Sequence, residues 1–159
     1  MLCKVVSGGQ SGVDRAALDA ARDVGLAIGG WCPRGRRALD GPIPVHYPLK
    51  ETPLRCYRQR TEWNVRDSDG TLIIYRKSMG RGTRLTYRLC DVYGRPCHLH
   101  CLDLNEDARL AFYRVHRWLV VKDIGILNVA GPRESKEAPV YDDAYRFLRV
   151  LFLSLVPGG

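Results

Sequence analysis

Apolar runs and helical periodicities alternate along this chain, and the first pair meets at a glycine-rich turn. The apolar run at residues 2–6 stops at Gly8 and Gly9, and apolar residues spaced three or four apart then predict a helix from Val13 to about Gly25. Glycines let the backbone approach a ligand, and the free amides of a helix start favour an anion. The turn therefore predicts a phosphate-binding loop, with a tight connection that binds nothing as the alternative.

The same order of strand, glycine loop and helix recurs later. A β-branched and aromatic run at residues 71–75 is typical of a strand covered on both faces. A second glycine-rich loop follows at 79–83, and a helix continues over 84–92. Shorter patterns predict three more strands and three more helices; the strands are at 26–28, 97–104 and 124–130, and the helices at 54–65, 106–121 and 142–156. This alternation predicts an α/β fold, a Rossmann-like, doubly wound, mainly parallel sheet with helices on both faces.

The length of 159 residues suits a single ligand-binding domain over residues 1–159. Within it, residues 31–53 carry five prolines and cannot form a helix. Apolar residues between the prolines can anchor this segment to the core. We therefore expect an ordered excursion that forms a structured lid near the first loop.

Ligands of doubly wound sheets bind at the carboxyl ends of the strands, so the glycine loops should lie at one edge. The third loop is Gly131 to Ser135, after the last strand. The expected strand ends and loops together carry polar residues that a purely structural loop does not need, namely Ser7, Gln10, Thr83, Asn128 and Arg133. Their convergence predicts a binding site.

The formal net charge of +8 indicates an attraction to anions. Arginine supplies most of the basic residues, and its planar fork suits a phosphorylated ligand, although arginine richness can also reflect genomic base composition. The chain shows no recognition-helix, zinc-finger or aromatic-sheet motif, so nucleic acid is not an expected partner. With no run of 18 apolar residues and no leader pattern, we expect a cytoplasmic protein that makes no use of a membrane. In that compartment the six cysteines are expected to be reduced.

Metal and catalytic groups are not expected. Cys97 and Cys101 would lie roughly 13 Å apart on a strand, and His98 and His100, which share a face, lack a third ligand. The acids beside the glycine loops, Asp14, Asp69 and Glu134, each have a structural interpretation at least as good as acid–base chemistry. We therefore assign no catalytic residue.

The last predicted helix, residues 142–156, is apolar nearly all round. One domain has no obvious means of covering every side of such a helix. We expect it to pack against another copy of the protein, with coverage by the domain's own neighbours as the alternative.

Several motifs together resemble the molybdenum-cofactor carrier family, a member of the SLOG group of Rossmann-like proteins. They lie at residues 7–19, 30–36, 40–44, 67–73 and 127–135, and the resemblance runs from about residue 4 to residue 148. It implies a protein that commonly oligomerises and shelters the phosphorylated, oxidisable pyranopterin of the molybdenum cofactor (molybdopterin). Molybdoenzymes would then receive this cargo. Residues 136–141 depart from the proline-glycine turn that the family tends to have there.

The resemblance also implies which residues bind the ligand. In the first loop these are Gly8, Gly9, Gln10 and Ser11, which would hold the phosphate; the second loop contributes Gly82 and Thr83, and the third Asn128, Gly131, Arg133 and Glu134.

Two other function classes fit the same loops. Related phosphoribohydrolases, which release a base from a nucleoside monophosphate, place a catalytic glutamate in the helix after the second loop, whereas residues 80–89 contain no carboxylate here. A nucleotide-sensing module would use the same pocket. We expect binding of a phosphorylated pterin or nucleotide without hydrolysis.

Overall fold

A computed structural model describes residues 1–103 and 106–156. Its central sheet has five strands in the order β2-β1-β9-β7-β8, and every pair of neighbours is parallel. The strands are β1 (Lys4–Val6), β2 (Ala27–Gly29), β7 (Gly70–Tyr75), β8 (Cys97–Cys101) and β9 (Ile126–Ala130). The predicted parallel sheet is confirmed. The strand expected at 97–104 ends at Cys101, and Leu104 lies outside the described residues.

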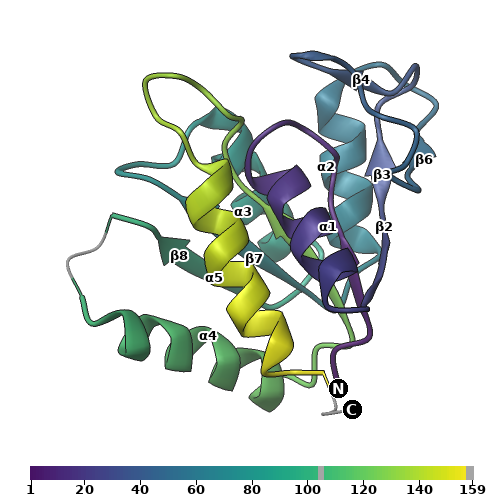
Figure 1. Ribbon diagram of the computed structural model, residues 1–159. Coiled ribbons are helices and arrows are strands. Elements are labelled where there is room, and N and C mark those ends of the chain that lie inside the picture. The colour runs from purple at the N-terminus through teal and green to yellow at the C-terminus, as the bar shows by residue number, and fades with distance from the viewer. Residues whose placement is uncertain (104–105, 157–159) are drawn as a thin grey trace.

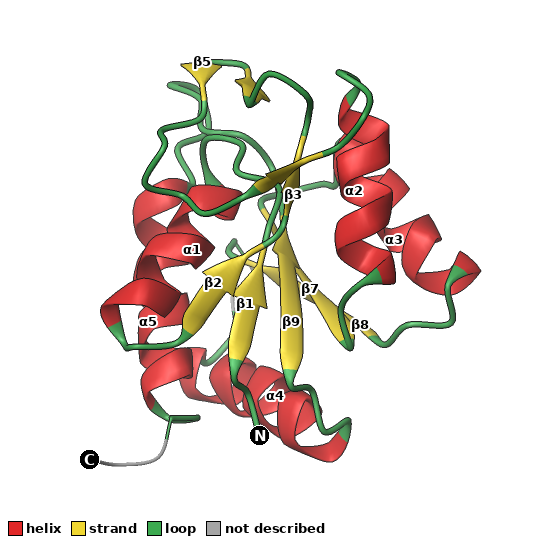
Figure 2. Ribbon diagram, turned by 90° about the vertical axis from the view of Figure 1, so that its right-hand side faces the viewer, coloured by secondary structure: helices red, strands yellow, loops and turns green. Residues whose placement is uncertain are grey.

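Helices cover both faces of this sheet, as predicted (Figures 1 and 2). One face carries α1 (Val13–Asp23), α4 (Ala108–Val121) and α5 (Tyr141–Leu153), and the other carries α2 (Tyr57–Arg66) and α3 (Arg81–Val92). Crossovers between parallel strands are right-handed, so the direction of each connection decides its face. The chain moves one way across the sheet through α1 and α4, and the opposite way through α2 and α3. The sequence order of the strands thus fixes the two helical layers.

The main core lies between the sheet and the layer of α1, α4 and α5. Its strand residues include Leu72, Ile74, Leu127 and Val129, all fully buried. A smaller cluster on the other face includes Val65 of α2 with Leu89 and Cys90 of α3. Strand β7 is therefore covered on both faces, which its uninterrupted apolar run predicted.

Helix α3 begins at Arg81, three residues before the predicted start. Placing Gly82 and Thr83 in a loop was therefore wrong, because both lie in the first turn of the helix. The amide of Arg84 donates to the Gly80 carbonyl at 3.0 Å, which closes that turn. A glycine stops a helix when it adopts a positive φ, and Gly82 does not.

The excursion between β2 and α2 contains two small sheets. β3 (Trp31–Cys32) pairs in parallel with β6 (Lys50–Glu51), and β4 (Arg37–Ala38) pairs antiparallel with β5 (Gly41–Pro42). The segment is ordered and has no helix, as its prolines predicted.

Arg36 organises the excursion from within. Its guanidinium donates to four backbone carbonyls of the segment, those of Ile43, Pro44, Tyr47 and Leu49. The side chains of Ile43 and Leu49 then pack against Gly9, where a Cβ would lie 2.9 and 2.5 Å from them. The predicted position near the first loop is confirmed, and Gly9 is needed for this close approach.

Helix α5 buries some of its apolar side chains within the chain and leaves others exposed. Four side chains, Ala144, Leu148, Leu151 and Phe152, are buried by the chain's own elements, chiefly α1. Val150 and Leu153 stay exposed at 57% and 47%. At the other end of the helix, Tyr141 and Tyr47 both donate to one carboxylate oxygen of Asp19, at 2.6 and 3.1 Å. This carboxylate joins α1, the excursion and α5.

The two histidines of β8 lie against aromatic rings. The ring centroid of His98 is 5.4 Å from that of Trp118, and His100 stacks on Phe147 at 4.1 Å. Burial lowers the pKa of both imidazoles below the usual value. In residues 1–103 and 106–156, no three His, Cys, Asp or Glu side chains gather as metal ligands. The helices of this part of the chain are also too short or too polar to cross a membrane.

Candidate functional site

The loop between β1 and α1 uses several of its amides inside the protein. Gln10 N donates to Asp14 Oδ2, Ser11 N to the Gln10 side-chain oxygen, and Val13 N to the Pro132 carbonyl, each at 3.2 Å. The side chain of Gln10 also accepts from the amide of Leu39 in the excursion. Three amides of this loop are therefore engaged within the protein, and a nearby side chain adds positive charge to it.

That side chain is Arg60 of α2. A Cβ at Gly8 would lie 2.1 Å from Arg60 Nη1, so the guanidinium lies directly against this glycine. The same Nη1 is 3.3 Å from Asp14 Oδ2, in the first turn of α1. The side chains of Asp14 and Arg60 are only 3% and 14% exposed. The pair thus places a guanidinium, paired with the Asp14 carboxylate, against the first glycine loop.

The burial of Asp14 makes its ionised form less favourable. Burial raises the pKa of Asp14 above its usual value, while Arg60 and the amide of Gln10 partly offset the rise. Asp14 is therefore held as a carboxylate by Arg60 more than by any other charge nearby. Its charge depends on a residue 46 positions away in sequence.

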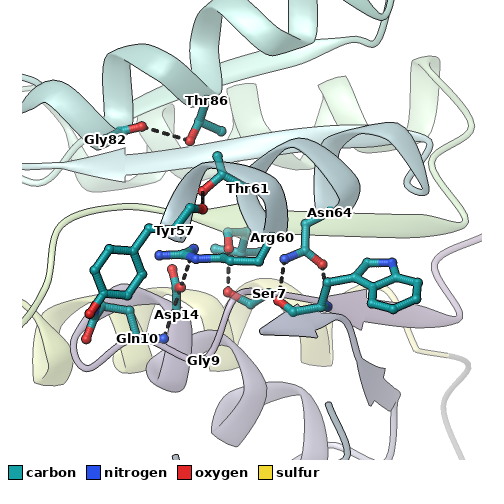
Figure 3. Close-up of polar contacts among 12 residues, drawn as sticks. Ser7, Gly9, Gln10, Asp14, Tyr57, Arg60, Thr61, Asn64, Gly82 and Thr86 are labelled. Atoms are coloured by element: carbon teal, nitrogen blue, oxygen red, sulfur yellow. Dashed lines mark hydrogen bonds and ion pairs between the residues drawn. The ribbon is translucent and has the colours of Figure 1, made fainter. Parts of the chain in front are cut away.

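Helix α2 turns a polar face toward this loop (Figure 3). Tyr57, Arg60, Thr61 and Asn64 follow the three- and four-residue spacing of one helical face. Two polar atoms on it, Tyr57 Oη and Arg60 Nε, are buried without a hydrogen-bond partner in the described structure. Such atoms cost free energy unless a further group satisfies them, and a ligand can do so.

Sequence reasoning missed this face. For the helix expected at 54–65, the apolar spacing places Leu54, Tyr57, Thr61 and Val65 on one face and the arginines on others. The signal was present, because polar residues at positions i, i+3, i+4 and i+7 form a stripe as readily as apolar ones do. A search for apolar spacing alone does not detect such a polar stripe.

The start of α3 has the most open backbone of the three glycine regions. A Cβ added at Gly80 or Gly82 would meet nothing within 4 Å. The helix has no side-chain cap and no acidic residue in its first turn, and Thr83 is buried beside these glycines. Its first amides can therefore receive an anion.

The third loop packs directly on the first. A Cβ at Gly12 would lie 2.5 Å from Glu134 N and 2.6 Å from the Pro132 carbonyl oxygen. A Cβ at Gly131 would lie 2.3 Å from the carbonyl oxygen of Ile74, at the end of β7. The predicted convergence is confirmed for these loops, and both glycines have a packing reason.

Arg133 and Glu134 are adjacent and oppositely charged, but they do not form an ion pair with each other. The Glu134 carboxylate accepts from the amides of Val140 and Tyr141, at 2.7 and 3.0 Å, and so caps the N-terminus of α5. Arg133 is exposed and takes part in no ion pair with the described residues.

Asn128 lies within the sheet and not among the loops, which corrects its assignment to the third loop. It sits in the middle of β9, between Val6 and Thr71 in the register, and its amide donates to Thr71 Oγ1 at 3.2 Å. Ser7 likewise donates to the carbonyl of Val129, at 2.7 Å. These two side chains bind the strands together below the edge.

Comparison with known proteins gives two similarities. The sequence pattern of the circularly permutated YpsA SLOG family matches residues 5–152. The crystal structure of a putative molybdenum carrier protein from Syntrophus aciditrophicus SB is 41% identical, with 94% of each chain covered and a TM-score of 0.90. None of the curated proteins matches the chain significantly. The family match over residues 5–152 spans the first and third loops and helix α2.

Proposed function

Because the chain belongs to the circularly permutated YpsA family of SLOG proteins, we propose that it binds and carries a phosphorylated ligand, the pterin of the molybdenum cofactor. The similar solved structure bears the name of a putative molybdenum carrier, which supports this choice of cargo. Molybdoenzymes would be the recipients. The observation that carries the proposal is the buried Arg60, with its unpaired Nε, on the first glycine loop.

The residues present suit a phosphate at this edge. A guanidinium can hold phosphate oxygens bidentately, and the first amides of α3, beside the open Gly82, can donate to an anion as well. Tyr57 Oη adds a buried hydroxyl without a partner. The cargo supplies the oxidisable pterin and the metal, while the chain binds the phosphate and covers the first loop with the excursion.

Replacing Gly82 with alanine tests where the ligand lies. The added methyl group meets no protein atom, and alanine favours a helix by roughly 0.5–1 kcal/mol, so the free energy of unfolding should not fall. A ligand held against the α3 amides would meet the methyl group, and we expect its affinity to fall about tenfold. Binding of molybdenum cofactor released from a purified molybdoenzyme, followed by pterin fluorescence, measures this.

Gly25→Ala is the control. A Cβ at Gly25 also meets nothing within 4 Å, but Gly25 follows the C-terminal end of α1, away from the glycine loops. This substitution should leave the affinity unchanged. Equal affinities in Gly82→Ala and the unmodified protein would place the ligand elsewhere, and no binding of the cofactor at all would refute the proposed cargo.

We also propose that bound nucleotides are not hydrolysed. The three acids beside the loops are all occupied: Asp14 by Arg60 and the Gln10 amide, Asp69 by the amides of Gly125 and Ile126, and Glu134 by the start of α5. Incubation with adenosine, guanosine and cytidine monophosphates should release no free base by chromatography. Glu134→Gln should instead cost about 1 kcal/mol of stability, since it weakens a helix cap. Base release that disappears in Glu134→Gln would favour the phosphoribohydrolase alternative.

We further propose that a second copy of the chain covers the outer side of α4 and α5. Apolar side chains lie exposed there, including Leu110, Tyr113 and Val121 of α4 and Val150 of α5, with exposures of 45–68%. Light scattering of the purified protein should give a mass above that of one chain, and Val150→Glu should lower it. A monomer at all working concentrations would contradict this proposal.

A further inference from the structure

A cavity of about 230 Å³ opens beside β1 and β2, on the face of the sheet that carries α2 and α3. The sheet supplies its apolar floor through Val6 of β1 and Ile126 of β9, and Trp31 and Lys50 line it from the excursion. Lys4, from β1, completes the lining on the sheet side.

The two lysines of this cavity have no carboxylate partner. None of the ion pairs of the described residues involves a lysine. Lys4 lies half-buried along Gly29, where a Cβ would be 3.3 Å from its Nζ. Lys50 is the register partner of Trp31 and holds its ammonium 5.9 Å from the centre of that indole ring. Both positive charges therefore border the cavity unneutralised.

The acid in the lining, Asp67, does not balance them. Its carboxylate accepts from Trp31 Nε1 at 2.8 Å and from the guanidinium of Arg66 at 2.7 Å. Arg66 lowers the pKa of Asp67, so the acid stays ionised in this pairing. The indole is thereby fixed in place as a wall of the cavity.

Asn64 and Gly30 separate the cavity from the glycine loops. Asn64 accepts from the amide of Trp31 and donates to its carbonyl, at 2.8 and 2.9 Å. Gly30, with a φ of +126°, lies so close to the first strand end that a Cβ would be 2.3 Å from the carbonyl oxygen of Ser7. A ligand in the cavity would therefore not touch the first loop.

We infer that this cavity binds a small organic anion that carries a planar apolar group. The carboxylate or phosphate would lie between Lys4 and Lys50, and the planar group against Val6, Ile126 and the indole of Trp31. Two ammonium groups supply charge without the fixed geometry of a guanidinium, so either anion fits. An aromatic wall and an apolar floor favour a ring over a free inorganic ion.

The test uses the full chain with phenyl phosphate, benzoate and inorganic phosphate as probes, followed by NMR of backbone amides and indole N–H groups. We expect saturable shifts of Gly29, Gly30 and the Trp31 indole with phenyl phosphate or benzoate, and weaker binding of inorganic phosphate. Lys4→Met should weaken binding about tenfold, because it removes one charge-assisted contact and keeps the apolar stem. Lys122→Met, at the exposed end of α4, is the control and should bind as the unmodified protein does.

Lys50→Met provides a second variant on an exposed residue, whose replacement does not endanger folding. Equal affinities in Lys4→Met, Lys50→Met and Lys122→Met would overturn the inference. Shifts confined to Gly82, Thr83 and the first loop would also overturn it, since they would assign the probes to the glycine loops. Inorganic phosphate binding as tightly as phenyl phosphate would remove the role given to Trp31 and the apolar floor.

Discussion

Arg60→Met is expected to lower the free energy of unfolding by about 3 kcal/mol, because it leaves Asp14 buried without its cation. The Asp14 side chain is 3% exposed, so water cannot replace the guanidinium. Methionine keeps most of the side-chain volume over Gly8, which separates the loss of charge from the loss of packing. Urea unfolding followed by circular dichroism measures the difference.

The size of this loss should depend on pH. Burial already raises the pKa of Asp14 above its value in the unfolded chain, and removing Arg60 raises it further. A group with a raised folded pKa contributes stability at low pH, and that contribution is lost as pH rises through the folded pKa. Above about pH 4 the unfolded chain ionises Asp14 freely. The variant should therefore be close to the unmodified protein in acid and progressively less stable toward pH 8.

The decisive control is the double variant that combines Arg60→Met with Asp14→Asn. With no carboxylate to neutralise, the double variant should regain stability relative to Arg60→Met and lose the added pH dependence. An Arg60→Met protein equally destabilised at pH 5 and pH 8 would show that Arg60 acts through packing alone. A double variant no better than the single one would lead to the same conclusion.

Gly12→Ala should be among the most destabilising single methyl additions in the chain. Gly12 has a φ of +91°, and a Cβ there would lie 2.5 Å from Glu134 N and 2.6 Å from the Pro132 carbonyl oxygen. These are backbone atoms and cannot rotate away, so the third loop must leave the first. We expect a loss of about 3 kcal/mol or more, or failure to fold, measured by urea unfolding and soluble yield.

Gly25→Ala separates backbone strain from the clash. Gly25 has a similar φ of +82°, but a Cβ there would meet nothing within 4 Å. It should cost only roughly 1–2 kcal/mol, the price of a left-handed residue. If Gly12→Ala were no more harmful than Gly25→Ala, the packing of the two loops would be looser than the distances indicate.

The fold was predictable because its signals are local. The continuous apolar run of β7 and the three- and four-residue spacing in α1 identify those elements without knowledge of the rest of the chain. Element ends were less certain, as the early start of α3 shows. The pattern of Gly80 and Gly82 predicts a loop, but glycines without a positive φ can begin a helix.

The candidate site was only half predictable because its main contacts are distant in sequence. A glycine motif does not reveal whether the glycine admits a ligand or another loop. Gly9, Gly12 and Gly131 touch protein atoms, whereas Gly82 faces open space. Nor could the sequence show that Arg60 turns inward to Asp14, since that contact depends on how α2 lies over the sheet.

The position of β1 has a consequence for how the chain folds during synthesis. Its neighbour β9 is the last described strand to be made, and Ser7 and the Val129 carbonyl that it bonds are 122 residues apart. One edge of β1 therefore has no native partner until residue 130 has been made. Pairing over such a sequence distance slows folding, and until then the backbone groups of this edge can pair with other chains.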